Sequence, residues 1–217
     1  MLDLKQLFLF KNQKYIVIDT ETEHLNLVLG KNRPWQISWL VCQGKEIKKE
    51  YDYYTKINNL KLSEGAAIVT HFNQYDYNSK AVSPQIVFDD LDSFISNPEY
   101  YIIWQNGLNF DINILRTFYS ICGKELEFNK ILPRTIDTSL LSRALLDDIK
   151  FPINLDSNFD LLVWQYKLKN HLKKGLKTNT KKMCEVLDIP YSENAHNALY
   201  DDRMCQQIFI KLLEKLS

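Results

Sequence analysis

Runs of apolar residues alternate with amphipathic stretches along this chain. Near the N-terminus, four apolar residues at 15–18 lead directly into Asp19 and Glu21. A run this apolar predicts a central strand over 14–19 that is covered on both faces. Strand side chains alternate between faces, so Asp19 and Glu21 share one face while Thr20 points to the other. Because ligand crevices form at the carboxyl ends of strands in α/β sheets, this end of the strand is the first candidate site.

The remaining pattern predicts four more strands, the first two forming an antiparallel hairpin and the last lying at a sheet edge. Apolar residues at helical spacing and capping residues predict the helices. The alternation predicts a single α/β domain over 1–217, with a central mixed β-sheet flanked by helices. The four strands are expected at 34–41, 46–55, 100–104 and 134–138, and helices at 63–67, 87–95, 110–121, 140–146, 161–172, 180–187 and 194–216.

Composition limits the functional classes. The chain has 217 residues, 45% apolar and 25% charged, as in ordinary globular proteins. Its formal net charge is zero, so binding to a polyanion must depend on local charge. We expect no membrane span and no signal peptide, because no apolar run is long enough and the N-terminus is charged. Four scattered cysteines without a C-x-x-C pair favour a reducing, cytoplasmic location over a zinc site or disulfide frame.

Two further acids stand at predicted helix starts. Asp111 opens the helix that follows the 100–104 strand, and Asp201 comes five residues after His196 at the start of the last helix. Each has an ordinary structural explanation, because the helix dipole favours acids in a first turn and such residues are often solvated. Asp202, beside Asp201, is predicted to be the solvated member of that pair.

Taken in order, three motifs resemble the DnaQ-like (DEDDh) branch of the DEDD superfamily of 3′→5′ exonucleases. Residues 19–22 match the first motif, 106–111 the second and 196–201 the third. The histidine of the third motif distinguishes this branch from the one that has tyrosine. The resemblance covers nearly the whole chain and implies a ribonuclease H-like fold. Segments 63–67 and 135–138 resemble two further stretches of the family.

The resemblance also implies a two-metal site. Mg²⁺, with Mn²⁺ as a substitute, would be held by Asp19, Glu21, Asp111 and Asp201, with Asp19 bridging both ions. Hard cations with oxygen ligands relieve the repulsion among such carboxylates. Two of them stabilise the attacking and leaving oxygens of a displacement at phosphorus. His196 would be the general base, since an imidazole with a pKa near 6.5 accepts protons near neutral pH.

Two departures from the family pattern lie near the substrate. Many members follow the first motif with Thr-Gly-Leu, whereas this chain has Glu23-His24-Leu25, and the second motif has three residues between Asn106 and Phe110 where some members have two. Leu25 either wedges against the last base, as in relatives, or anchors its loop. Asn106 is expected to hold the turn before Asp111, and Phe110 to lie in the core.

A lysine-rich stretch precedes the third motif. No acid occurs between 161 and 184, and the one-signed charge suggests either a solvated face or a groove for a phosphate backbone. The predicted substrate-binding residues are Thr20, Thr22, Leu25, Asn106, Lys173, Lys174 and Lys177.

The main hypothesis is a metal-dependent 3′→5′ exonuclease that releases nucleoside 5′-monophosphates from single-stranded 3′ ends. DNA is slightly favoured over RNA, and proofreading beside a separate DNA polymerase is one role considered. The alternatives are a catalytically silent nucleic-acid-binding subunit on the same fold and an RNA-trimming exoribonuclease. An endonuclease with a ribonuclease H-like fold is disfavoured by the third motif. Monomer and homodimer both stay open.

Overall fold

A five-stranded sheet forms the centre of the protein. The computed structural model describes residues 3–28, 31–152, 155–171, 173–192 and 197–215. Within them the strand order is β3-β2-β1-β4-β5, so β1 is central. The strands are β1 (Lys14–Thr22), β2 (Pro34–Gln43), β3 (Glu46–Tyr54), β4 (Tyr101–Trp104) and β5 (Thr135–Asp137).

The sheet is mixed, as predicted. β1 runs antiparallel to β2 and parallel to β4, and β5 lies parallel to β4 at the edge. The β2–β3 hairpin is antiparallel and turns at Gly44, whose positive φ of 58° suits glycine. The register pairs Asp19 with Ser38, and Ser38 with Asp52. These three side chains therefore share one face of the sheet.

Helices cover both faces of the sheet, and most lie where the pattern predicts them. Two helices, α2 and the one-turn α5, are absent from the predicted set. Helix α2 buries only Tyr77, although Asn73 caps it through the amides of residues 75 and 76. The α-helices are α1 (Glu64–Val69), α2 (Gln74–Lys80), α3 (Pro84–Ile95), α4 (Asp111–Ile121), α5 (Phe128–Ile131), α6 (Thr138–Leu146), α7 (Asn158–Asn170), α8 (Thr180–Val186) and α9 (Ala198–Lys215); a π-helical turn (Gln6–Phe10) and a 3₁₀ turn (Leu132–Arg134) complete the list.

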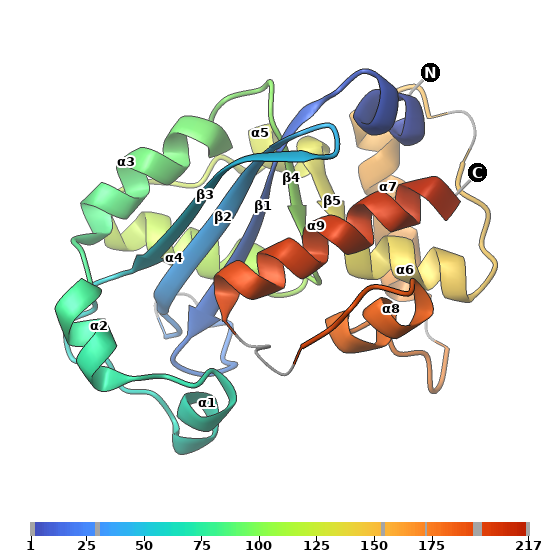
Figure 1. Cartoon of the computed structure of the whole chain (residues 1–217). Coiled ribbons are helices and arrows are strands. Elements are labelled where there is room, and N and C mark those ends of the chain that lie inside the picture. Colours follow the sequence, from blue (N-terminus) through green and yellow to red (C-terminus); the bar gives the residue numbers. More distant parts are fainter. Residues whose placement is uncertain (1–2, 29–30, 153–154, 172, 193–196, 216–217) are drawn as a thin grey trace.

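Alternating side chains of β1 enter two separate cores. Tyr15 and Val17 pack with Phe209 on the α9 face, whereas Ile16 and Ile18 pack against α3 and α4 on the other. Figure 1 shows α9 crossing one face of the sheet while α3 and α4 cover the opposite face. Burying each large apolar side chain contributes about 1.5–3 kcal/mol. Both faces of β1 are thus fixed, and with them the directions of the acids at its end.

The carboxyl end of β1, the first turn of α9 and helix α1 lie at the same end of the molecule (Figure 1). Helix α1 is capped by Ser63, whose hydroxyl oxygen accepts from the amide of Ala66. None of the helices in the described part of the chain is both long and apolar enough to cross a membrane.

Candidate active site

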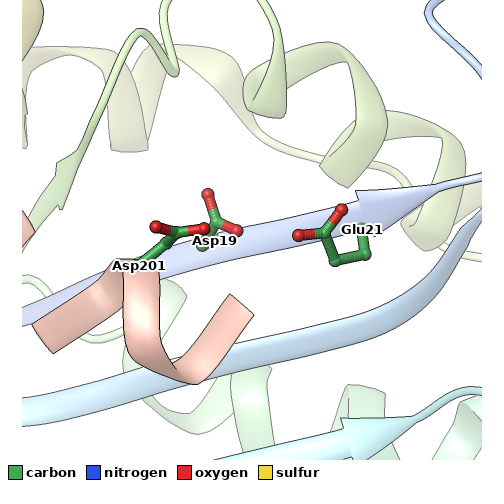
Figure 2. Close-up of side chains that lie close together, drawn as sticks. All are labelled: Asp19, Glu21 and Asp201. Atoms are coloured by element: carbon green, nitrogen blue, oxygen red, sulfur yellow. The ribbon is translucent and has the colours of Figure 1, made fainter. Parts of the chain in front are cut away.

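Three carboxylates meet at the carboxyl end of β1. One oxygen from each of Asp19, Glu21 and Asp201 lies within 4.8 Å of the others. Figure 2 shows Asp19 and Glu21 extending from β1 and Asp201 from the first turns of α9. The period-two geometry of the strand and the packing of α9 on the same face bring these groups together.

Asp111 reaches the site from the opposite layer. It is buried at the first position of α4, and its Oδ1 accepts a 2.7 Å hydrogen bond from the hydroxyl of Thr20. Thr20 points away from Asp19 and Glu21, as predicted. Its hydroxyl is engaged by Asp111, although the residue also lines a neighbouring pocket.

The carboxylates sit in an unfavourable electrostatic environment. Burial, and then the charges of Asp111 and Glu21, raise the pKa of Asp19 well above its usual value. Burial and the charge of Asp201 do the same to the pKa of Glu21. Burial raises the pKa of Asp111 to about 7, against the opposing hydrogen bond from Thr20. A proton or a cation is needed to relieve this repulsion near neutral pH.

The loop before α4 is held by Asp137. This fully buried carboxylate accepts hydrogen bonds from the amides of Asn106 at 2.9 Å, Leu108 at 3.1 Å and Ser139 at 3.0 Å. Asn106 takes a left-handed conformation with φ of 65°, and its carbonyl accepts from the amide of Phe110. Asn106 therefore holds the turn before Asp111, as predicted.

Glycine is required within this loop. A Cβ atom on Gly107 would lie 2.1 Å from Cγ of Trp104, which is fully buried in the α3–α4 core. The carbonyl of Gly107 accepts from the amide of Ile112 in the first turn of α4. Close packing of backbone against indole therefore sets where α4 begins.

Asp202 is not solvated, so that prediction was wrong. The residue is fully buried, and its Oδ2 accepts a 2.5 Å hydrogen bond from the hydroxyl of Ser38 on β2. Burial raises its pKa well above the usual value, with Ser38 opposing and Asp201 adding to the effect. Asp201 and Asp202 point in different directions because adjacent helical positions differ by about 100°.

The loop after β1 is fixed by an ion pair between the buried Glu23 and the half-buried Arg33. Arg33 donates to both carboxylate oxygens of Glu23, at 2.7 and 2.6 Å, and to the carbonyls of Asn58 and Asn59. The amide of Lys61 also donates to Glu23, at 2.9 Å. This clamp joins the loop to the segment that leads into α1. It stands where many relatives have the threonine of Thr-Gly-Leu.

A largely apolar pocket of about 690 Å³ lies on the Glu21 side of the carboxylates. Leu25 lines it with 84% of its surface exposed, so it does not anchor its loop. Phe110 is half-buried in the pocket wall instead of the core, which corrects that prediction. The lining is Thr20, Glu21, Thr22, His24, Leu25, Ser63, Gly65, Ala66, Val69, Thr70 and Phe110.

A second, more polar pocket of about 370 Å³ adjoins the other side of the carboxylates. Asp19 and Asp201 line it together with Lys181, Asn179 and Tyr191. These last three residues are not among the predicted site residues, although Lys181 belongs to the lysine-rich stretch that precedes the third motif.

The remaining predicted residues are placed as follows. None of Lys173, Lys174 and Lys177 is among the described residues that line the two pockets, and Lys173 is paired with Asp147. The hydroxyl of Thr22 is engaged by the carbonyl of His24 at 2.8 Å. His196 lies outside the described residues, so its role stays a prediction.

The donor set fits a hard divalent cation. Three carboxylates each offer an oxygen within a span that one ion can bridge, and their mutual repulsion is the kind that Mg²⁺ or Mn²⁺ relieves. The pKa values of Asp19 and Glu21 are raised by their burial and their neighbouring carboxylates, and a bound cation would supply the positive charge that offsets both.

Similar structures support the fold. Crystal structures of E. coli Exonuclease I with a dT13 oligonucleotide (TM-score 0.70, 18% identity) and with a zinc ion and single-stranded DNA (0.71, 16%) each match 94% of this chain. Cell-death related nuclease 4 (CRN-4) matches with a TM-score of 0.67 and 12% identity, over 94% of this chain and 64% of its own. The chain spans about two fifths (41%) of the Exonuclease I chains. These matches confirm the predicted ribonuclease H-like fold.

Sequence comparison gives the family. No curated protein matches the chain. The model of the Rv2179c-like 3′-5′ exoribonuclease domain matches residues 15–213, a range that includes all three predicted motifs. The resemblance to the DEDD exonucleases is confirmed, and the chain belongs to the Rv2179c-like 3′-5′ exoribonuclease domain family of that superfamily.

Proposed function

We propose that this protein is a metal-dependent exonuclease that shortens single-stranded RNA from its 3′ end and releases nucleoside 5′-monophosphates. The observation that carries the proposal is the meeting of Asp19, Glu21 and Asp201 within 4.8 Å in a member of an exoribonuclease family. The pockets on either side of these carboxylates provide space for a strand end.

RNA is proposed over DNA because the family model, which spans most of the chain, is described as an exoribonuclease domain. The sequence alone slightly favoured DNA, and the Exonuclease I structures include complexes with DNA oligonucleotides. At 16–18% identity those structures support the fold, so DNA stays as the second candidate substrate.

The carboxylates would hold the metal. We assign Asp19, Glu21 and Asp201 to direct cation binding, with Mg²⁺ as the physiological ion and Mn²⁺ as a substitute. Asp111, held by Thr20, adds negative charge from the opposite layer. Two bound ions would supply charge neutralisation at the reacting phosphate and would lower the pKa of the attacking water.

The reaction is a hydrolysis. A water oxygen forms a bond to phosphorus, the bond from phosphorus to the 3′-oxygen of the preceding nucleotide breaks, and that oxygen takes up a proton. His196 is proposed as the general base that accepts the proton of the water. Glu21 orients this water, and Asp111 acts on the leaving-group side.

The pockets suggest how a strand end binds. The terminal base would occupy the apolar pocket between Leu25 and Phe110, whose side chains offer stacking surface without base-specific hydrogen bonds. Lys181 in the polar pocket would contact a phosphate on the other side of the carboxylates. This placement would make the enzyme tolerant of base sequence.

The proposal also covers domain organisation, cellular location, partners and oligomeric state. A single exonuclease domain over 1–217 is proposed, and four free cysteines support a reducing, cytoplasmic location. A polymerase partner and the choice between monomer and homodimer stay predictions.

The proposal is tested with 5′-labelled single-stranded RNA and DNA of identical sequence. We expect a stepwise ladder with Mg²⁺ and with Mn²⁺, none with EDTA, and faster shortening of RNA. Asp19→Asn and His196→Ala should abolish the ladder, while Glu99→Gln, a surface change, should leave it unchanged.

The rival functions give different results in the same assay. Binding of oligonucleotide without shortening in either metal would indicate the catalytically silent subunit. Internal fragments at early times would indicate an endonuclease. Faster shortening of DNA than of RNA would support the exonuclease activity but would show that DNA is the preferred substrate.

A further inference from the structure

His24 stands at a position where many relatives have glycine, and it is one of the residues that line the apolar pocket. The backbone around it is tightly held. Its carbonyl accepts from the hydroxyl of Thr22 and from the side-chain amide of Asn32, and its own backbone amide donates to Oδ1 of Asn32 at 3.2 Å. Asn32 is itself buried. The side chain at position 24 is therefore directed by a fixed turn.

A backbone hydrogen bond also selects one tautomer of the neutral His24 ring. Its Nδ1 accepts a 3.1 Å hydrogen bond from the backbone amide of Asn26. A nitrogen that accepts carries no proton, so the proton of the neutral imidazole resides on Nε2. Within the described part of the chain, Nε2 has no hydrogen-bond partner. His24 thus offers the pocket one fixed N–H donor.

Most other polar side chains that line the pocket already form hydrogen bonds within the protein. The hydroxyls of its three threonines donate their protons within the protein: Thr20 to Asp111, Thr22 to His24 and Thr70 to the carbonyl of Ala66. Only the Ser63 hydroxyl and the His24 ring are left as side-chain donors among the described lining residues.

The position of His24 along the loop matches the sugar of a bound nucleotide. It follows Glu21, at the metal end of the pocket, by three residues and directly precedes Leu25, at the apolar end. A nucleotide with its phosphate at the carboxylates and its base between Leu25 and Phe110, as proposed above, would have its ribose between these two ends of the pocket. A donor there faces the sugar hydroxyls.

We infer that His24 is a specificity-determining residue, whose Nε2–H donates to the 2′-oxygen of the 3′-terminal ribose. This inference rests on the proposed exonuclease function. It would explain why the enzyme prefers RNA over DNA. A 2′-hydroxyl is the group that separates RNA from DNA, and a deoxyribose leaves the donor unpaired.

The test uses oligonucleotides that are identical except at the last sugar, which is ribose, deoxyribose or 2′-fluoro-deoxyribose. For removal of that nucleotide, we expect the wild type to prefer ribose over deoxyribose by about tenfold in kcat/KM, as one hydrogen bond to a half-exposed donor provides. The 2′-fluoro sugar, a weak acceptor, should behave like deoxyribose.

Two variants form a matched pair. A glutamine side chain at this position would place an amide N–H near the position of Nε2, whereas the shorter asparagine side chain reaches only the position of Nδ1. His24→Gln should therefore keep most of the ribose preference, and His24→Asn should reduce the ratio to about one. Melting temperatures of both variants show whether the loop is intact.

The outcomes separate the two claims. If no oligonucleotide is shortened, the proposed exonuclease function fails. If the wild type removes ribose and deoxyribose ends at the same rate, or if His24→Asn keeps the full preference, the assignment to His24 is overturned while the exonuclease stands. Equal wild-type rates on ribose and deoxyribose ends would overturn the assignment even if both variants fold poorly.

Discussion

The hydroxyl of Ser38 on β2 donates a 2.5 Å hydrogen bond to the buried carboxylate of Asp202 on α9. Asp202 directly follows Asp201, so this bond fixes the helical turn that presents Asp201 to Asp19 and Glu21. This hydrogen bond joins β2 to α9 directly beside the carboxylate cluster. One acid of this consecutive pair contributes to the cluster, and the other contributes to packing.

Exchanging the two acids separately tests this division of roles. Asp201→Asn should lower exonuclease activity at least about 100-fold with little change in melting temperature, because it removes one of the three carboxylates proposed to bind the cation. Asp202→Asn should keep most activity, since the amide oxygen still accepts from Ser38. Ser38→Ala should lower the free energy of unfolding by about 1–3 kcal/mol by leaving a buried acceptor unsatisfied. Equal losses of activity in both Asn variants would contradict the assignment.

The Glu23–Arg33 pair predicts a pH dependence of stability. Burial acts to raise the pKa of Glu23, but hydrogen bonds from Arg33 and the amide of Lys61 outweigh it and hold this pKa below its usual 4.5. A depressed acid pKa stabilises the fold above pH 4.5, and this contribution is lost as pH falls. In urea titrations, Glu23→Gln should cost about 2 kcal/mol at pH 7 and progressively less toward pH 3.

Glu99→Gln is the matched control for that series, because Glu99 pairs with Lys14 on the surface. It should change stability little at any pH. A cost for Glu23→Gln that does not vary with pH would show that the clamp acts by packing alone.

Divalent cations should stabilise the protein more strongly as pH rises. Burial and neighbouring carboxylates raise the pKa values of Asp19 and Glu21, and burial raises that of Asp111 to about 7. For acids with raised pKa values, stability is complete below the ordinary values near 4 and is lost as pH rises through the elevated ones. A cation restores it where protons have left.

Thermal unfolding measures this effect directly. The increase in melting temperature on adding Mg²⁺ should be small at pH 5 and larger at pH 8, and Asp19→Asn should reduce it. An increment of the same size at both pH values would mean that the cation binds elsewhere.

Gly107→Ala should be costly, because its methyl group would collide with the indole of Trp104. We expect a loss of about 1–3 kcal/mol or more in the free energy of unfolding, together with reduced activity from a displaced α4. Gly65→Ala on α1 is the control for stability, since a Cβ there meets no atom within 4 Å. A stable Gly107→Ala variant would show that the 105–110 loop can move without affecting the fold.

The strands and the cluster of Asp19, Glu21 and Asp201 could be predicted because they follow from local pattern. Period-two alternation directs the two acids of β1 to one face, and the third motif supplies Asp201 at a helix start. The lengths and order of apolar runs likewise predicted the mixed sheet.

Features that depend on tertiary packing could not be predicted. Asp202 is buried because α9 lies over Ser38, a contact between residues 164 positions apart in the chain. Phe110 faces a pocket because α1 and the loop after β1 leave space there. Helix α2 has polar sequence and one buried residue, so no periodicity marks it.

Removal of single nucleotides from a 3′ end at the Asp19–Glu21–Asp201 cluster can be followed in a single-turnover experiment. Single-stranded RNA labelled on its 3′-terminal nucleotide is mixed with excess protein and Mg²⁺, and the first labelled product is identified. We expect a labelled nucleoside 5′-monophosphate as the first product with the wild type and none with Asp19→Asn. A labelled oligonucleotide as the first product, or an unchanged rate in Asp19→Asn, would contradict this expectation.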